Sequence, residues 1–248
     1  MIVIIEDLHS HTYFSDCSAT NPDELVKRAI ENGIEILGIS DHSYGITKQR
    51  GFFESCDKKL FEESCQKSIN EYYTFLISLK NKYRDYIDIK CGIEIPTRNT
   101  PNILLPSSID VSFFDYCLAE DINSDITTEK DIFKFAKRCG CPFVGIAHTD
   151  LVSFLKFKEI DKLNFFTKMA ESNIFWELNV NKDSIHNFKE HSYVNNFFND
   201  SETQDAIRKS GMKMSVGFDS HKVDEYGSER IKECCEKLCA LDIKLLYE

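Results

Sequence analysis

Two histidines near the start of the chain have the spacing of metal ligands. His9 and His11 follow an apolar run over residues 2–5, which predicts a short buried strand. Residues two apart on a strand point to the same side, so both imidazoles should leave one face together. Asp16 follows after a turn-prone stretch and adds a carboxylate. This set suits zinc, manganese or iron, although the His-x-His pair alone fits an exposed strand end equally well.

Histidines and carboxylates also end the apolar runs further along the chain. Each run is short enough to be a buried strand, and each ligand-type side chain comes at or near its carboxyl end. The spacing Asp219-x-His221 repeats that of His9-x-His11. The other residues that share this placement are His42, Glu94 and His148.

The elements that position these side chains are expected to alternate between strands and helices. Strands are predicted over residues 2–5, 34–39, 87–95, 116–122, 142–147, 174–180 and 213–218. Helices are predicted from Asn21-Pro22 to the stop at Gly33, and over 58–83, 129–138, 158–171, 202–209 and 228–241. Residues 43–55 predict a polar loop, and residues 181–200 predict a loop with or without a short helix.

About seven strand–helix units without a linker predict a single domain over residues 1–248. The alternation implies a parallel sheet buried on both faces, and this many units favour a closed or nearly closed α/β barrel over an open sheet. Barrel active sites lie at the carboxyl ends of the strands, and the first and last strands are neighbours. The two paired motifs would therefore face each other, which predicts a site for several metal ions.

The composition restricts the partners and the compartment. The net charge is −11, so no basic surface is expected, and a long nucleic acid is not an expected partner. No secretory signal or bilayer-spanning apolar run is found, which predicts a cytoplasmic protein that does not bind membranes. The ten cysteines would then be reduced and mostly buried. Cys17, beside Asp16, is the cysteine expected to be sensitive to oxidation near the site.

The ordered set of motifs resembles the polymerase-and-histidinol-phosphatase (PHP) family of metal-dependent phosphoesterases. The motifs span Asp7 to about Gly227 and comprise His9-x-His11, Asp16, Asp41-His42, Gly92-Ile93-Glu94, Ala147-His148 and Asp219-x-His221. The resemblance implies a distorted (β/α)7 TIM-like barrel with two to three divalent zinc, iron or manganese ions. It implies a first ion on His9, His11, Glu94 and Asp219, a second on Asp16, His42 and His221, and a third on Glu94 and His148.

The sequence departs from the family after the fourth strand. Many relatives place a histidine there as a ligand of the third metal, whereas residues 116–122 contain none. Glu120 or Asp121 would substitute, since carboxylates bind zinc and manganese; the alternative is a weak or empty third site. The amidohydrolase superfamily also opens with His-x-His. Its pattern fits less well, because the last motif here is Asp219-x-His221 and the fourth strand has no lysine.

The expected chemistry is hydrolysis of a phosphate ester by a metal-activated water, with the eight ligands as the catalytic residues. The resemblance to histidinol-phosphatase members favours a small phosphomonoester. The alternatives are a PHP-type nuclease or nucleotide phosphodiesterase, and a metal-binding domain with weak or no catalysis. Asn179 either orients a ligand or caps its strand, whereas His186 and His191 are not expected as ligands. Cations that would hold the phosphate are Lys48, Arg50, Arg98 and Lys222.

Overall fold

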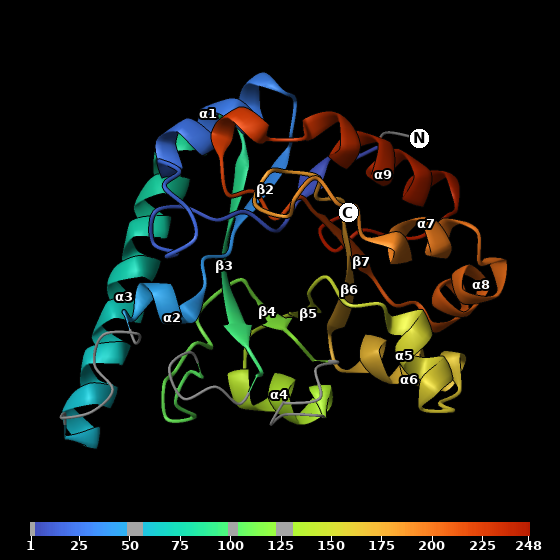
Figure 1. Cartoon of the computed structure of the whole chain (residues 1–248), viewed down its shortest axis with the longest axis horizontal. Helices are drawn as coiled ribbons and strands as arrows, with labels where there is room; N and C mark the ends of the chain where they lie inside the picture. Colours follow the sequence, from blue (N-terminus) through green and yellow to red (C-terminus); the bar gives the residue numbers. More distant parts are fainter. Residues whose placement is uncertain (1–2, 49–56, 99–103, 123–130) are drawn as a thin grey trace.

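The computed structural model describes residues 3–48, 57–98, 104–122 and 131–248. Seven parallel strands pair in the order of the sequence, each hydrogen-bonded to the next. Figure 1 shows them inside a ring of helices. The strands are β1 (Glu6–Asp7), β2 (Ile36–Ile39), β3 (Asp88–Pro96), β4 (Tyr116–Glu120), β5 (Val144–Ile146), β6 (Ile174–Asn179) and β7 (Met214–Gly217).

The end of β1 also meets the end of β7, so the sheet nearly closes into a barrel. Leu8 N donates to Val216 O over 2.9 Å, and His11 N donates to Ser220 O over 2.8 Å. The predicted seven-unit barrel is therefore confirmed. The first and last paired motifs lie on neighbouring strands, as the barrel prediction requires.

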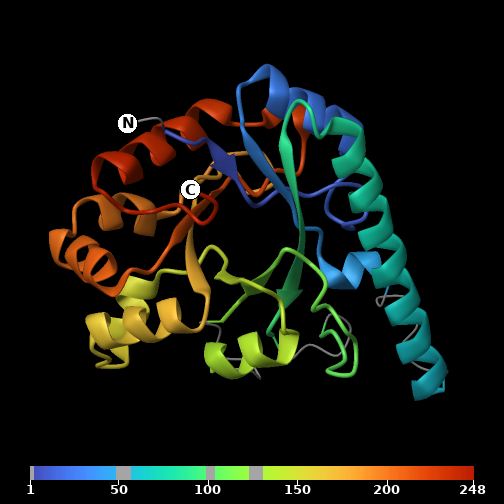
Figure 2. The same cartoon turned by 180° about the vertical axis from the view of Figure 1, so that it is seen from behind.

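Helices surround the strands, as Figures 1 and 2 show from opposite sides. The long α3 (Lys58–Tyr83) runs along one flank and has its predicted bounds. In the described residues, no helix combines the length and the apolar character needed to cross a membrane. The others are α1 (Pro22–Glu31), α2 (Ser43–Ile46), α4 (Ile132–Cys139), α5 (Leu151–Phe157), α6 (Lys162–Glu171), α7 (Ser192–Phe198), α8 (Ser201–Ser210), α9 (Ser228–Ala240) and the 3-10 turn η2 (Val223–Glu225).

The prediction of the first strand was wrong in position. The strand pairs through Glu6 and Asp7, which face Ile36 and Leu37 of β2, and not through residues 2–5. Both acidic residues are fully buried. An apolar run predicts a buried strand, but the two residues that form this strand are acidic although they are buried. The prediction therefore placed the strand too early, on the apolar residues 2–5.

Two helices were not predicted. Residues 43–46 form α2 in place of the expected loop. The helix expected over residues 158–171 begins only at Lys162, and α5 precedes it, because Asp150 and Asp161 each accept a hydrogen bond that caps a separate helix start. Glu159 between them has a positive φ of 53°, which ends the first helix.

Aromatic rings fill the barrel interior where glycines leave room. The ring of Tyr116 packs against Gly38 and Gly92, and a Cβ at either glycine would overlap it. The hydroxyl of Tyr116 donates to Leu8 O over 2.6 Å, which ties β4 to the end of β1. This packing gives the ligand-bearing strand ends a rigid support.

Glu6 makes the stability of the fold depend on pH. Burial raises the pKa of Glu6 to about 8, against an ordinary value of 4.5. Between these values the unfolded chain loses its proton while the folded chain keeps it, so the unfolding free energy falls as pH rises. The fall is about 1.4 kcal/mol per unit of pKa difference.

We therefore expect Glu6→Gln to flatten the pH dependence of stability between pH 4.5 and 8. Glutamine keeps the shape of the protonated acid and its acceptor for Tyr247 N. Urea unfolding at several pH values measures the difference between the two proteins, which includes the effect of the Glu6 charge on its neighbour Asp7. Parallel stability curves would contradict the assignment to Glu6.

Candidate metal centre

His9 is held in a tautomer that leaves one nitrogen for a metal. Its Nδ1–H donates to Oε1 of Glu177 on β6 over 2.7 Å, since a carboxylate can only accept. Both side chains are buried. A carboxylate behind a histidine is the usual arrangement that orients a metal-binding imidazole. The lone pair of a neutral His9 is therefore on Nε2.

His11 is oriented in the same way by a hydroxyl. Oγ of Ser15 donates to Asp41 over 2.6 Å, so it can only accept from Nδ1–H of His11, 3.2 Å away. The Nε2 atoms of His9 and His11 then face each other at 3.1 Å. Oδ1 of Asp219 lies 3.0 Å from Nε2 of His11. Two imidazole lone pairs and a carboxylate oxygen at these separations fit a shared cation.

Glu94 on β3 lies among three of the histidines. Its Oε1 is 3.4 Å from Nε2 of His9 and 3.3 Å from Nε2 of His148. Its Oε2 is 2.8 Å from Nδ1 of His42, yet neither of these two atoms has a hydrogen bond of acceptable geometry. Buried polar atoms without a partner are rare and costly. A metal ion bound at either atom would supply the missing partner.

Glu120, at the end of β4, also belongs to this cluster. Its Oε2 lies 3.6 Å from Nδ1 of His42. His42, Glu94 and Glu120 offer ligand atoms that all lie within 4.8 Å of one another. Asp121 instead pairs with Arg98, at 3.1 Å between Oδ2 and Nε. Of the two carboxylates predicted in place of the missing histidine, Glu120 is the one that lies among the candidate ligands.

Two ligand-type residues stand on strained backbone. His148 has a φ of 28° and Asp219 a φ of 56°, values that residues other than glycine rarely adopt. Hydrogen bonds hold both: His148 N donates to Oε2 of Glu177 over 2.7 Å, and Asp219 N donates to His9 O over 2.6 Å. Strain of this kind gathers at functional sites, where the surrounding structure maintains it.

His221 approaches the centre from the loop after β7. Its Nδ1–H donates to the carbonyl of Asp219 over 2.8 Å, which leaves Nε2 as the lone-pair nitrogen of the neutral ring. His11, Cys17, His42 and His221 form a second group with ligand atoms within 4.8 Å of one another. Asp16 is exposed and belongs to none of the four ligand groups found among the described residues. Its role as a ligand stays a prediction.

Two further buried carboxylates fix the loops that carry the ligands. Asp7 accepts from His9 N at 3.1 Å and from Phe218 N at 3.0 Å, so it joins the ends of β1 and β7. Asp41 accepts from Thr12 N at 2.6 Å and shapes the loop after β1. Burial raises the pKa of both, to about 6 for Asp7. These contacts preorganise the ligand positions.

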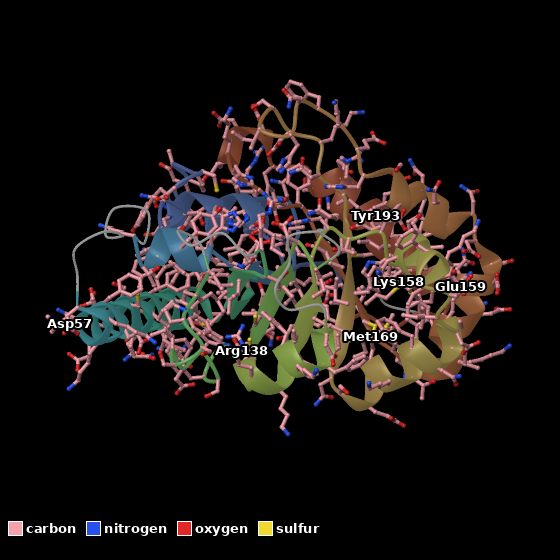
Figure 3. The ribbon with its side chains drawn as sticks, turned by 60° about the horizontal axis from the view of Figure 1, so that its bottom comes forward. Asp57, Arg138, Lys158, Glu159, Met169 and Tyr193 are labelled. Atoms are coloured by element: carbon pink, nitrogen blue, oxygen red, sulfur yellow. The ribbon has the colours of Figure 1, made fainter. Side chains whose placement is uncertain are left out.

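Strand β6 contributes two supporting residues, of which the sequence analysis named only Asn179, as a residue that orients a ligand or caps the strand. Glu177 and Asn179 lie two apart on the same face, and Nδ2 of Asn179 donates to Oδ2 of Asp219 over 3.4 Å. Tyr193 of α7, labelled in Figure 3, donates from its hydroxyl to Glu177 O over 3.0 Å. The alternation Glu177-x-Asn179 at a strand end is the sequence signal that points to both residues.

The loop after β6 brings two more histidines near the centre. Nδ1–H of His186 donates to Asp183 over 2.8 Å, and its Nε2 lies 3.5 Å from Oδ2 of Asp219. The ring of His191 stacks on that of His148, with centroids 6.2 Å apart. Neither histidine was expected as a ligand. Their proximity follows from the folding of this loop, which strand patterns do not reveal.

The four basic residues predicted to hold phosphate differ in their surroundings. Arg98 is engaged by the carboxylate of the turn after β4. Lys222 is partly exposed beside the His221 loop, and its Nζ donates to Oγ of Ser184 over 2.6 Å. Lys48 is exposed at the end of α2. Arg50 lies outside the described residues.

The charges of the centre favour bound cations. Burial would raise the pKa of Glu94, but the positive charges of His42 and His9 hold it well below its ordinary value. Burial lowers the pKa of His148, but the carboxylates of Glu94, Asp219 and Glu177 together raise it to about 9. Burial and the charge of His42 lower the pKa of His11 to about 3. A metal must displace the protons of its imidazole ligands, so metal affinity should fall as pH decreases.

Gly217 on β7 leaves the space in which Glu177 reaches His9. A Cβ at this position would overlap Oε1 of Glu177 and lie 2.6 Å from Cβ of His9. We expect Gly217→Ala to displace Glu177 and to weaken metal binding about 10- to 100-fold, the usual cost of losing a partner behind a ligand. Titration of the apo protein with Zn²⁺ measures this change.

Ser215→Ala is the matched control on the same strand. Its buried hydroxyl has no hydrogen-bond partner in the described part of the chain, so its removal should leave metal affinity unchanged. Equal zinc affinity in the Gly217 variant and the control would contradict the role given to the glycine.

The comparisons with known proteins identify the family of this chain. The PHP domain family matches residues 7–242, so the chain belongs to the PHP family. Membership of this family supports the class of metal-dependent phosphoesterases. A search of the curated proteins finds no match.

One solved structure supports the fold. A histidinol phosphate phosphatase from Lactococcus lactis, complexed with zinc, L-histidinol and phosphate, is 17% identical with a TM-score of 0.54. The match covers 97% of this chain and 95% of that one. A candidate histidinol phosphatase from Listeria monocytogenes is 14% identical with a TM-score of 0.45, over 90% of this chain and 97% of that one.

Proposed function

We propose that this chain is a metal-dependent phosphoesterase that hydrolyses a small phosphomonoester. The observation that supports this proposal most strongly is that ligand-type side chains converge at the carboxyl ends of the strands of a PHP-family barrel. These residues are His9, His11, His42, Glu94, His148, Asp219 and His221. The Nε2 atoms of His9 and His11, 3.1 Å apart, support a cation between them, because both offer a lone pair to a metal ion when the imidazoles are neutral.

The proposed ligand sets follow the resemblance to the family. Bound ions would polarise the phosphate and activate a water molecule. The chain's own residues would orient the ligands: Glu177 holds His9 and the backbone of His148, and Ser15 holds His11. The sets are His9, His11, Glu94 and Asp219 for the first ion, His42 and His221 with Asp16 for the second, and Glu94 and His148 with Glu120 for the third.

The proposed substrate is similar to histidinol phosphate. The solved structure from Lactococcus lactis holds L-histidinol and phosphate in this fold. The net charge of −11 also favours a small substrate over a long nucleic acid. Lys222 supports phosphate binding best, since it follows His221 directly and lines the same open pocket. Lys48, Arg50 and Arg98 stay further candidates.

Metal analysis of the freshly purified protein, joined to a hydrolysis screen, tests this function. The screen compares histidinol phosphate, nucleotides and short oligonucleotides. We expect two to three metal ions per chain and a preference for one phosphomonoester. Preference for oligonucleotides would favour the nuclease alternative. Metal-free and inactive protein, even after reconstitution with manganese, iron and zinc, would overturn the proposal.

We also propose that residues 1–248 form one domain. The family match over residues 7–242 and the contacts between the first and last strands support this. A single cooperative unfolding transition, seen with both fluorescence and circular dichroism, is the expected result.

A further inference from the structure

The loop between β1 and α1 places a thiol among three imidazoles of the centre. Sγ of Cys17 and one nitrogen each of His11, His42 and His221 lie within 4.8 Å of one another. We propose that Cys17 is a thiolate ligand of the second metal ion, in the position that the resemblance to the family assigns to Asp16. The inference rests on the proposed function, because it requires a metal centre.

The single lone pair of His11 belongs to the first ion position, so His42, His221 and the Cys17 thiolate are the donors left for the second. Two neutral imidazoles and one thiolate, with a fourth position open to water or substrate, suit a catalytic zinc ion. Thiolates favour zinc or ferrous iron, whereas carboxylates favour manganese and magnesium. A thiolate in place of a carboxylate would therefore shift this position toward zinc.

The histidines of this set are poised for a ligand independently of the cysteine. The side chain of His42 is 9% exposed, and its Nδ1 has no hydrogen bond of acceptable geometry. The Nδ1–H of His221 donates to the carbonyl of Asp219, so the neutral ring has its lone pair on Nε2. The ring centroids of His11 lie 4.5 Å from those of both His42 and His221. The short ring distances place the first ion position, which includes His11, directly beside the second.

The loop that carries Cys17 is fixed to the loop after β7. Oγ of Ser18 donates to His221 O over 2.9 Å, and Oγ1 of Thr20 donates to the same carbonyl over 2.9 Å. Tyr13 N donates to Thr20 O over 3.0 Å and closes the loop. The thiol is therefore held against the imidazoles by contacts on its C-terminal side, although Cys17 itself is exposed.

Metal binding by Cys17 would exchange a proton for the metal ion. The S–H bond of Cys17 breaks, an Sγ–metal bond forms, and the proton leaves to solvent. No oxidant or reductant is required. Exposure of the free thiol also means that alkylating reagents can reach it whenever no metal is bound.

Cobalt substitution of the full chain tests the inference with a spectroscopic signal. Co²⁺ replaces zinc at such sites, and a thiolate ligand gives a sulfur-to-cobalt charge-transfer band in the near ultraviolet. We expect this band in the wild type and in Asp16→Asn, and its loss in Cys17→Ser. Cys239→Ser, a partly exposed cysteine on α9 outside the ligand groups, is the matched control and should keep the band.

Two further measurements separate the possible outcomes. Zinc titration of Cys17→Ser should show about 10- to 100-fold weaker binding at this position. Loss of a residue that only orients a ligand already has this effect, so loss of a ligand itself should weaken binding at least as much. Zinc should also protect Cys17, but not Cys239, from iodoacetamide, as located by peptide mass spectrometry.

Protein that binds cobalt without the charge-transfer band would overturn the role of Cys17 and leave the metal-dependent function intact. Loss of bound cobalt in Asp16→Asn, with full retention in Cys17→Ser, would assign the position to the carboxylate instead. Protein that binds no metal under any condition would overturn both this inference and the proposed function.

Discussion

The double variant Asp219→Asn with His221→Ala is expected to lose both hydrolysis and bound metal while the barrel stays folded. Oδ1 of Asp219 lies 3.0 Å from Nε2 of His11 and 3.5 Å from Nε2 of His9. His221 belongs to two of the ligand groups. The two changes therefore weaken the first and second ion positions together. Loss of metal stabilisation worth several kcal/mol lowers kcat/KM about 10³-fold or more.

The fold should survive because the barrel seam does not depend on these side chains. Backbone hydrogen bonds from Leu8 to Val216 and from His11 to Ser220 join β1 and β7, and Asp7 reinforces them. Circular dichroism and urea unfolding check the fold, and mass spectrometry of the metals checks the centre. Asp224→Asn, an exposed carboxylate three residues beyond His221, is the control for the charge change. Unchanged turnover in the double variant would contradict metal-dependent hydrolysis.

The sequence locates the candidate metal ligands better than the groups that orient them. His9, His42, Glu94, His148 and Asp219 could be found because a parallel barrel brings all strand ends to one level. The position of Glu177 near the end of β6 could be found in the same way, but its role behind His9 could not. Its partner His9 is 168 residues earlier in the chain, and the contact depends on the barrel's closure and on the space left at Gly217.

Residues in loops were harder to place than residues on strands. The family resemblance assigns Asp16 to the second ion, yet the structure places its neighbour Cys17 among the ligand-type atoms. Strand periodicity fixes which side chains share a face, whereas a loop's direction depends on hydrogen bonds between distant segments. Here those bonds run from Ser18 and Thr20 to the carbonyl of His221. The same limit explains His186, whose position depends on the fold of the loop after β6.

Glu120→Ala is expected to remove about one equivalent of metal, whereas Asp121→Ala is expected to remove none. Both carboxylates follow the strand where relatives have a histidine, but only Glu120 lies within reach of His42 and Glu94. Asp121 is engaged by Arg98. Because a carboxylate can replace the histidine as a ligand, the third position should depend on Glu120 alone.

The pH dependence of the metal content provides a second test of Glu120 as a ligand. Burial, followed by the charge of Glu94, raises the pKa of Glu120 to about 7. Below that pH the carboxyl carries a proton that competes with a metal ion, so the Glu120-dependent equivalent should be lost as pH falls from 8 to 6. Metal analysis of the wild type and both variants at the two pH values measures the effect. Equal metal content in the wild type and Glu120→Ala at pH 8 would mean that the third position lacks this ligand.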